Sequence, residues 1–360
     1  MKGPLEVLED LLRIESPSGR EEGVVAYLHD LLERAGARPI VQGRNIWAVR
    51  GTDDGPTLLL NSHTDTVPAT SAWTRPPFGA VTEDGKLYGL GVSDAKSCVV
   101  GLLWAFLEAK VPRGRLIFSA TCEEEIGGQG LEVVVPQLPA VDAAIVGEPT
   151  GMEPCVGQRG RVLIECTAVG RAGHASRPWQ GDNAIYRAAR AIAGIERLEL
   201  APENALLGRA TVCVSLISGG TRSNVIPPEC SFTIDGRSTP EVSNVALVEQ
   251  VKAAASAGGA DAIRVNVKSS RYVPVQTAES EVLVQAALAA SPGSAVRAFG
   301  GISDLFHVRH CPGIILGPGS PPQSHQADEH IERSAVERGV EVYRRTVEEY
   351  FARRAGTREL

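Results

Sequence analysis

The chain has 360 residues, of which 43% are hydrophobic and 22% are charged, a composition typical of a folded globular protein. Its formal net charge of −7 argues against a surface for nucleic acid or an anionic membrane, and no stretch approaches the roughly 20 apolar residues of a membrane span. Seven scattered cysteines without CxxC pairs, and an N-terminus without an apolar signal core, favour a cytoplasmic protein with reduced thiols.

The first part of the chain is predicted to form an α/β domain. Leucines at helical spacing predict a helix over residues 5–12, and a second helix is expected over about 21–35. Short apolar runs then predict buried strands, with helical patterns between some of them. The strands are predicted at 45–49, 57–60, 116–120 and 143–146, and the helices at 97–109 and 130–135. This alternation favours a largely parallel sheet, in which ligands bind beyond the carboxyl ends of the strands.

The middle of the chain follows a different order of elements. The patterns predict a strand at 162–169, a helix at 183–195, strands at 210–218 and 230–237, a helix at 242–255 and a strand at 263–268. This β-α-β-β-α-β order is typical of a ferredoxin-like, split βαβ domain. We expect it to be an insertion over residues 160–270, so that residues 1–159 and 271–360 form the first domain. An amphipathic helix predicted over 334–352 would return to that domain.

Histidines and carboxylates recur in this sequence just after predicted strands or in glycine-containing segments. They are His63, Asp65, Asp94, Glu123, Glu124, Glu125, Glu148 and His325. Imidazole together with carboxylate suits zinc or cobalt better than magnesium or calcium. A lone His-x-Asp would usually be structural, and a run of glutamates would usually be a solvated helix start. The complete set, in this order, predicts a two-metal hydrolase site.

The chemistry of such a site restricts the roles of these residues. Two cations about 3.5–4 Å apart activate water and polarise an amide carbonyl. Five imidazole or carboxylate ligands serve two ions only if one carboxylate is shared between them. A further carboxylate would accept the proton of the water and deliver it to the departing amine. Spacing alone does not assign these roles among Glu123, Glu124 and Glu125.

The chain resembles the family of dinuclear zinc amidohydrolases that contains acetylornithine deacetylase, succinyl-diaminopimelate desuccinylase and glutamate carboxypeptidase. The resemblance covers almost the whole chain and is greatest for the acetylornithine deacetylase branch. Its segments are Leu-Asn-Ser-His-Thr-Asp-Thr-Val at 60–67, Ser-Ala-Trp-Thr-Arg at 71–75, Gly-Lys-Leu-Tyr-Gly at 85–89 and Gly-Glu-Pro-Thr-Gly-Met at 147–152. The resemblance implies a zinc-peptidase-like catalytic domain with an inserted lid and dimerisation domain.

The resemblance also implies two divalent ions, with zinc expected and cobalt able to substitute. The implied ligands are His63 and Glu148 for one ion, Glu125 and His325 for the other, and Asp94 as the bridge between them. Asp65 would orient His63, and Glu124 would be the general base. In this family the peptide after the bridging aspartate is cis, so the bond between Asp94 and Ala95 is expected to be cis.

Further residues are implied in substrate binding. His174, in Gly-His-Ala-Ser, matches a histidine that reaches the active site of the partner subunit and stabilises the oxyanion, so a homodimer is expected. Asn224 and Arg237 match residues that hold the carboxylate of the substrate, a task that suits the planar arginine side chain. Ser303 and Asp304 lie in a segment that resembles another loop of the site.

The resemblance finally implies hydrolysis of a small-molecule N-acyl amino acid. The expected reaction converts N2-acetyl-L-ornithine and water to acetate and L-ornithine, a step of arginine biosynthesis. N-succinylornithine, succinyl-diaminopimelate, or a dipeptidase or carboxypeptidase substrate are alternatives, because all share the same metal chemistry. A catalytically silent metal-binding relative is an alternative of another class, although Asp94 and Glu124 are both present.

Overall fold

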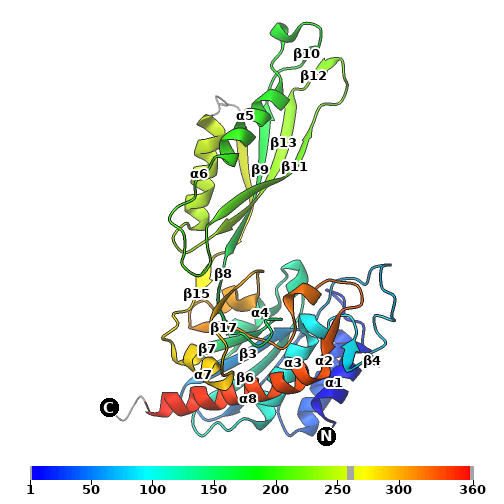
Figure 1. The fold of residues 1–360 in the computed structure, drawn as a ribbon, viewed down its shortest axis with the longest axis vertical. Coiled ribbons are helices and arrows are strands. Elements are labelled where there is room, and N and C mark those ends of the chain that lie inside the picture. Colours follow the sequence, from blue (N-terminus) through cyan, green and yellow to red (C-terminus); the bar gives the residue numbers. More distant parts are fainter. Residues whose placement is uncertain (1, 258–262, 357–360) are drawn as a thin grey trace. The chain divides into compact units, whose positions relative to one another are not determined.

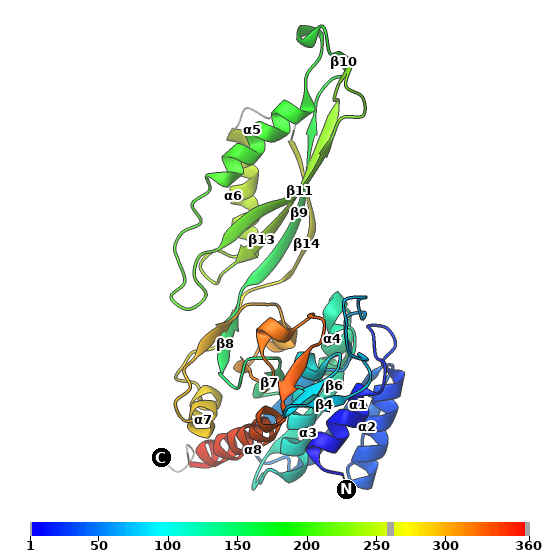
Figure 2. The ribbon, with the colours of Figure 1, turned by 45° about the vertical axis from the view of Figure 1, so that its right-hand side comes forward.

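The chain forms two compact units (Figures 1 and 2), and the computed structural model describes residues 2–257 and 263–356. Unit 1 comprises Met1–Val156, Thr277–Phe299 and Ser303–Leu360, and unit 2 comprises Gly157–Gln276 and Gly300–Ile302. The insertion expected over residues 160–270 falls within unit 2. Residues 1, 258–262 and 357–360 lie outside the described parts of the chain.

Unit 1 is built around a mixed sheet whose central strands are parallel. The central strands are, in spatial order, β6 (Arg115–Thr121), β3 (Thr57–His63), β7 (Ala143–Gly147) and β17 (Gly313–Ile315). The outer strands β1 (Ile40–Gln42) and β2 (Asn45–Gly51) are antiparallel and extend the sheet beyond β6. Strand β8 (Cys155–Gln158) pairs with β15 (Val275–Gln276) and β16 (Arg297–Phe299). The α/β class and the mostly parallel centre expected from the sequence are confirmed.

The central strands are almost entirely buried because helices cover them. Every residue of β3 and β7 is buried, which explains their continuous rather than alternating apolar pattern. Helix α3 (Ser97–Glu108) packs on β3, β6 and β7. Helices α1 (Pro4–Leu12) and α8 (Arg333–Gly356) contact α3, and α7 (Val282–Ala290) packs on α8. Helices α2 (Glu22–Arg34) and α4 (Gly130–Val134) contact β2.

The sequence patterns do not predict several short elements of unit 1. These are α7, β17 and a small sheet of β4 (Val81–Glu83), β5 (Lys86–Tyr88) and β18 (His330–Glu332). Each of these strands has only three residues, which is too short for an alternating pattern to be recognised. The small sheet is relevant to the candidate site, because its strand β18 follows the segment that contains His325.

Unit 2 is an antiparallel sheet with two helices on it. The strands lie in the order β11 (Thr211–Gly219), β13 (Glu229–Ser238), β9 (Gly160–Val169) and β14 (Ile263–Tyr272), and the helices are α5 (Ala184–Glu196) and α6 (Asn244–Ala257). Burial alternates along β9 and β13, because one face of the sheet packs against the helices. The predicted β-α-β-β-α-β order is present, with two additional short strands, β10 (Gly173–His174) and β12 (Val225–Ile226).

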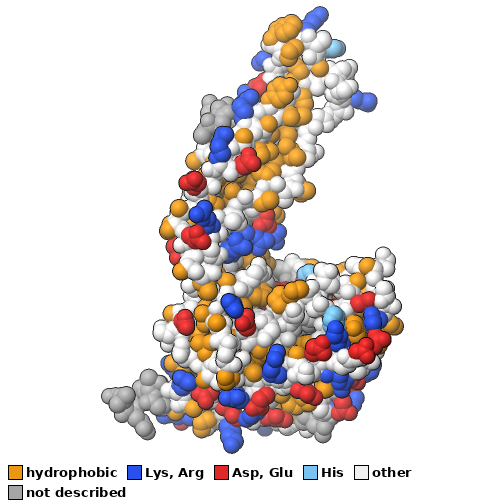
Figure 3. Space-filling view, viewed as in Figure 1, with side chains coloured by type: hydrophobic (Ala, Val, Ile, Leu, Met, Phe, Trp, Pro, Cys, Tyr) orange, Lys and Arg blue, Asp and Glu red, His pale blue; other side chains and the backbone are white. Residues whose placement is uncertain are grey.

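Hydrophobic and charged side chains are distributed differently over the visible face of each unit. On the face drawn in Figure 3, hydrophobic side chains run along unit 2, whereas charged side chains of both signs are frequent over unit 1. The exposed hydrophobic residues of unit 2 include Tyr186, Leu216, Ile217 and Val245. Among the described residues, no helix combines the length and apolar character that crossing a membrane requires.

Candidate active site

The parallel strands of unit 1 bring the candidate ligands to one edge of the sheet. His63 is the last residue of β3, Glu148 directly follows β7, and Glu124 and Glu125 begin a short turn three residues after β6. Because β6, β3 and β7 are neighbours and run in the same direction, their carboxyl ends meet. Asp94 joins them from the helical turn Val92–Lys96 that precedes α3.

Two groups of ligand atoms share Asp94. In the first, Nε2 of His63 lies 3.2 Å from Oδ1 of Asp94 and 3.9 Å from Oε2 of Glu148. In the second, Nε2 of His325 lies 2.9 Å from Oε2 of Glu125 and 3.7 Å from Oδ2 of Asp94. Ligand atoms bound at about 2.0–2.1 Å to one tetrahedral ion are about 3.3 Å apart. Each group therefore fits a zinc-sized ion, and the two oxygens of Asp94 face different groups.

The charges of this cluster also favour bound cations. Burial raises the pKa of Glu124 and Glu148 well above the usual carboxyl value, and repulsion from neighbouring carboxylates adds to the effect. Burial raises the pKa of Glu125 as well. Burial alone would lower the pKa of His63, but its carboxylate neighbours raise it well above the usual value. Such an excess of buried negative charge is relieved by divalent cations, and the imidazole and carboxylate donors suit zinc.

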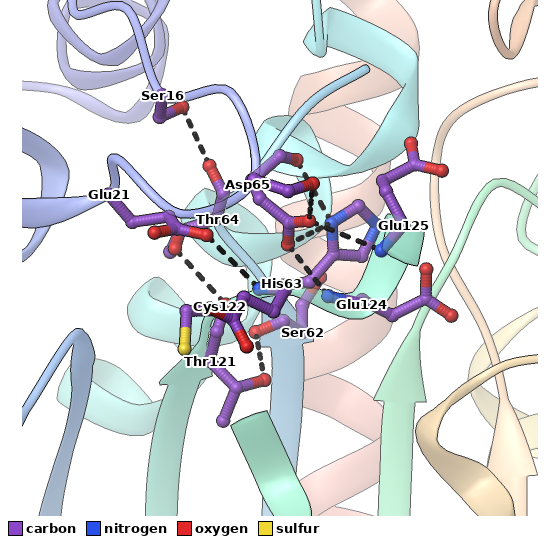
Figure 4. A network of polar contacts seen from close by, with 12 residues as sticks. Ser16, Glu21, Ser62, His63, Thr64, Asp65, Thr121, Cys122, Glu124 and Glu125 are labelled. Carbon is purple, nitrogen blue, oxygen red and sulfur yellow. Dashed lines mark hydrogen bonds and ion pairs between the residues drawn. The ribbon is translucent and has the colours of Figure 1, made fainter. Parts of the chain in front are cut away.

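Asp65 contacts both His63 and the turn that carries the two glutamates. Its Oδ1 lies 3.4 Å from Nδ1 of His63. Its two oxygens accept hydrogen bonds from the backbone N–H groups of Glu124 and Glu125 at 3.1 and 3.2 Å (Figure 4). The hydroxyl of Ser18 donates to the same carboxylate at 2.7 Å. These contacts suit a residue that orients the ring of His63 and the backbone of Glu124 and Glu125.

Glu329, which the sequence patterns do not single out, holds the loop that presents Asp94. Its buried carboxylate accepts hydrogen bonds from the N–H groups of Gly91, Ser93 and Asp94 at 2.8, 2.7 and 3.0 Å. The expected cis peptide after Asp94 is present in this loop. The only signal in the sequence is that Glu329 is an acidic residue shortly after His325.

Three of the predicted residues lie in unit 2 and are not all close together. His174 and Asn224 are neighbours, because β10 pairs with β12 and the N–H of Ala175 donates to the carbonyl of Asn224 at 3.0 Å. The exposed ring of His174 accepts a hydrogen bond from the N–H of Ser176 at 3.1 Å. Arg237 instead lies near the far end of β13, where its Nε donates to Asp235 at 2.6 Å.

The length of β13 separates Arg237 from the other two residues. The beginning of this strand, at Glu229, lies near β12, and Arg237 is eight residues further along. A strand advances by about 3.3 Å per residue. One copy of unit 2 therefore cannot place Asn224 and Arg237 on the same small carboxylate, as the sequence-based roles would suggest.

Ser303 and Asp304 lie in unit 1, where the protein itself engages their polar atoms. The side chain of Ser303 accepts a hydrogen bond from the N–H of Leu305 at 3.2 Å. The buried carboxylate of Asp304 accepts hydrogen bonds from Asn61 at 3.1 Å and Thr121 at 3.2 Å, and burial raises its pKa to about 6. This geometry favours a supporting role for both residues over the predicted contact with substrate.

Comparison with known proteins places this geometry in a family. The pattern of peptidase family M20/M25/M40 matches residues 59–349. The succinyl-diaminopimelate desuccinylase of Roseobacter denitrificans is 29% identical, over 97% of this chain and 99% of that protein. A tripeptidase from Staphylococcus aureus has a similar structure with a TM-score of 0.80 at 23% identity, over 97% of this chain and 98% of that one. A dinuclear metal binding peptidase from Bacillus subtilis gives a TM-score of 0.73 at 16% identity, over 98% of each chain. The chain belongs to peptidase family M20/M25/M40.

Proposed function

We propose that this protein hydrolyses the amide bond of an N-acyl amino acid with the help of two divalent metal ions, zinc being expected. The observation that carries the proposal is Asp94, whose two oxygens face the two ligand groups 3.2 Å from His63 and 3.7 Å from His325. Bound divalent cations supply Lewis acidity, which polarises an amide carbonyl and lowers the pKa of water. His63 and Glu148 would hold one ion, and Glu125 and His325 the other.

Glu124 would be the general base of this reaction. It is next to Glu125 on the same turn, and Figure 4 shows the two side chains leaving the turn in different directions. One can therefore bind metal while the other faces the water. Beside two cations, the Glu124 carboxylate would stay ionised, take the proton of the water and give it to the departing amine. Asp65 would keep the backbone of both glutamates in place during this transfer.

The acyl group is the finer part of the proposal. The relatives named succinyl-diaminopimelate desuccinylase support a succinyl-diaminopimelate substrate, while the acetylornithine deacetylase branch expected from the motifs receives no specific support from them. N2-acetyl-L-ornithine, with a role in arginine biosynthesis, is kept as the second candidate. The segments at 71–75 and 147–152, which resemble that branch, support it.

We also propose that the protein is a homodimer formed through unit 2. Strand β11 is at the edge of its sheet, and its Leu216 and Ile217 are 67% and 58% exposed. An exposed edge strand with apolar side chains favours pairing with another chain. His174 would then stabilise the oxyanion in the active site of the other subunit.

The test is amine release by zinc- or cobalt-loaded protein from a matched panel. The panel contains succinyl-diaminopimelate, N-succinylornithine, N-acetylornithine, N-acetylcitrulline and a dipeptide. Preference for an N-acyl amino acid supports the proposal, and the preferred member identifies the pathway. Preference for the dipeptide would mean that the substrate is a peptide and not an N-acyl amino acid. Silence across the panel with two metals bound would favour the catalytically silent relative.

A further inference from the structure

Four successive backbone N–H groups of the segment after β6 donate to side-chain oxygens. The donors are Cys122, Glu123, Glu124 and Glu125, and the acceptors are Asn45 at 3.0 Å, Glu21 at 3.1 Å, and the two oxygens of Asp65 at 3.1 and 3.2 Å. Figure 4 shows Glu21 and Asp65 beside this segment, with the side chains of Glu124 and Glu125 beyond it. The sheet ladder ends at Thr121, so side chains distant in the sequence fix the path of the chain here.

Glu123 has an unusual backbone conformation within this segment. Its φ of 61° and ψ of 23° lie in the left-handed region, which residues with side chains seldom adopt. The space it needs is left by Gly128, where a Cβ atom would come within 2.3 Å of the Cβ of Glu123. This conformation turns the chain immediately before Glu124 and so determines where Glu124 and Glu125 point. The surrounding structure must hold it.

Arg44 joins this residue to a buried carboxylate. Its Nε donates to Oε2 of Glu21 at 2.6 Å, and its Nη2 donates to Oε1 of Glu123. The side chain of Glu21 is fully buried, and its Oε1 also accepts a hydrogen bond from the N–H of Gly19 at 2.9 Å. The planar guanidinium can contact two carboxylates at once, which a lysine ammonium does with less geometric definition.

We infer that Glu21, Arg44 and Glu123 form a clamp that positions the general base Glu124 and the metal ligand Glu125. The inference rests on the proposed function of these two glutamates. Glu21 holds the backbone of Glu123, and Arg44 ties the side chains of Glu21 and Glu123 together. The three residues are positioning residues, because they would act on Glu124 and Glu125 only through the backbone of this segment.

The clamp has an asymmetric consequence for metal binding. Glu125 belongs only to the ligand group of His325, whereas His63 at the end of β3 and Glu148 directly after β7 belong to the other group. Loss of the clamp should lower the affinity for the ion held by Glu125 and leave the affinity for the other ion nearly unchanged. Contacts of this kind around a metal ligand typically change metal affinity or activity by about 10–100-fold. If the three residues only stabilised the fold, their loss would instead lower the affinity for both ions together with the thermal stability.

The experiment titrates metal-free full-length protein with Zn²⁺ in a calorimeter and follows thermal unfolding in parallel. The main variant is Arg44→Met, and His325→Ala identifies which binding step depends on Glu125. Arg44→Met/Glu21→Gln removes both charges, so that no unpaired buried carboxylate threatens folding. Arg44→Lys tests rescue by charge, and Arg115→Met, which breaks the exposed pair with Asp53, is the matched control.

His325→Ala should abolish one of the two zinc-binding steps. We expect Arg44→Met and the double variant to lower the zinc affinity of that same step by about 10–100-fold. The zinc affinity of the other step should stay within about twofold of the wild-type value. The decrease in kcat should be larger than the change in KM, and Arg44→Lys should recover part of the lost zinc affinity. Arg115→Met should behave as wild type. Unchanged zinc binding in both clamp variants, or equal weakening of both steps, would overturn the clamp. Failure of the wild-type protein to bind two Zn²⁺ ions would instead overturn the proposed function itself.

Discussion

The candidate residues of the two units differ in how firmly the protein holds them. In unit 1, His63 and Asp65 are buried, and Glu125 and Asp94 contact several neighbours at the edge of the sheet. In unit 2, His174 lies on the short strand β10 and Asn224 directly precedes its partner β12, and both residues are exposed. The comparison indicates that the candidate ligands of unit 1 are already held close together, so that metal binding there would require little further ordering. The roles proposed for the residues of unit 2 would require another surface beside them.

The direction of the strands explains part of this difference. In a parallel sheet the carboxyl ends of neighbouring strands lie at one edge, so β6, β3 and β7 contribute to a single site. In the antiparallel sheet of unit 2, β9 and β13 run in opposite directions, and Arg237 lies at the end of β13 away from Asn224. The parallel strands of unit 1 therefore bring candidate residues together, whereas the antiparallel strands of unit 2 keep Arg237 and Asn224 apart.

The largest expected effect tests the proposed general base of unit 1, Glu124. Glu124→Gln keeps the size of the side chain but removes the base, so kcat should fall by about 10²–10⁴-fold. Metal content, measured by atomic emission, should stay at two ions per chain. Glu337→Gln, an exposed glutamate on α8, is the control and should keep full activity. Near-normal turnover by the Glu124 variant would show that another residue is the base.

The next largest effect tests the exposed residues of unit 2. His174→Ala should lower kcat by about 10²–10³-fold, because a donor to the oxyanion is lost. Zinc affinity and thermal stability should not change, since the exposed ring hydrogen-bonds with the nearby Ser176. Mixing His174→Ala with Glu124→Gln should restore partial activity if His174 acts across subunits. Absence of recovery, despite exchange of subunits shown by mass spectrometry, would place its action within one chain.

A third effect tests whether the metal site stabilises only unit 1. Zinc at about 100 times its dissociation constant should stabilise the unit that binds it by about 2.7 kcal/mol. Hydrogen exchange with mass spectrometry should show slower exchange in peptides from β3, β6 and β7 and no change in those from β9 and β13. Equal protection of both sets would mean that the two units unfold together.

The smallest effect tests the stability of unit 2 alone. Asn183 caps α5, where its side chain accepts hydrogen bonds from the N–H groups of Ile185 and Tyr186 at 2.9 and 3.4 Å. Asn183→Ala should destabilise the protein by about 1 kcal/mol in urea unfolding, and Asn183→Asp should retain most of the stability. Zinc affinity should be the same in both variants. A change in zinc affinity would link the helix of unit 2 to the metal site.

A large part of the fold can be predicted because its main elements are long enough to show their period. The helices at α1, α2 and α3 and the strands at β3, β6 and β7 all coincide with predicted segments to within a few residues. The order of elements in unit 2 is likewise visible in the sequence. The three-residue strands β4, β5, β17 and β18 are not, since three residues carry no recognisable alternation.

The candidate metal ligands were identifiable from the sequence because His63 and Glu148 directly end or follow a strand. Their supporting contacts were not identifiable, because the partners are far apart along the chain. Glu21 meets Glu123 across 102 residues, and Glu329 meets Asp94 across 235. Which distant hydrogen-bonding groups meet is decided by the packing of the sheet edge and its loops.

The sequence by itself determined the α/β class, the inserted unit and the identity of the chemical groups, because residue type and periodicity are local properties. Only the tertiary structure decided that Asp94 faces two ligand groups, that Asp304 is buried against Asn61 and Thr121, and that Arg237 lies away from Asn224. These outcomes depend on strand direction and on contacts between distant segments. No local pattern carries that information, since the free energy of such contacts arises only when the chain is packed.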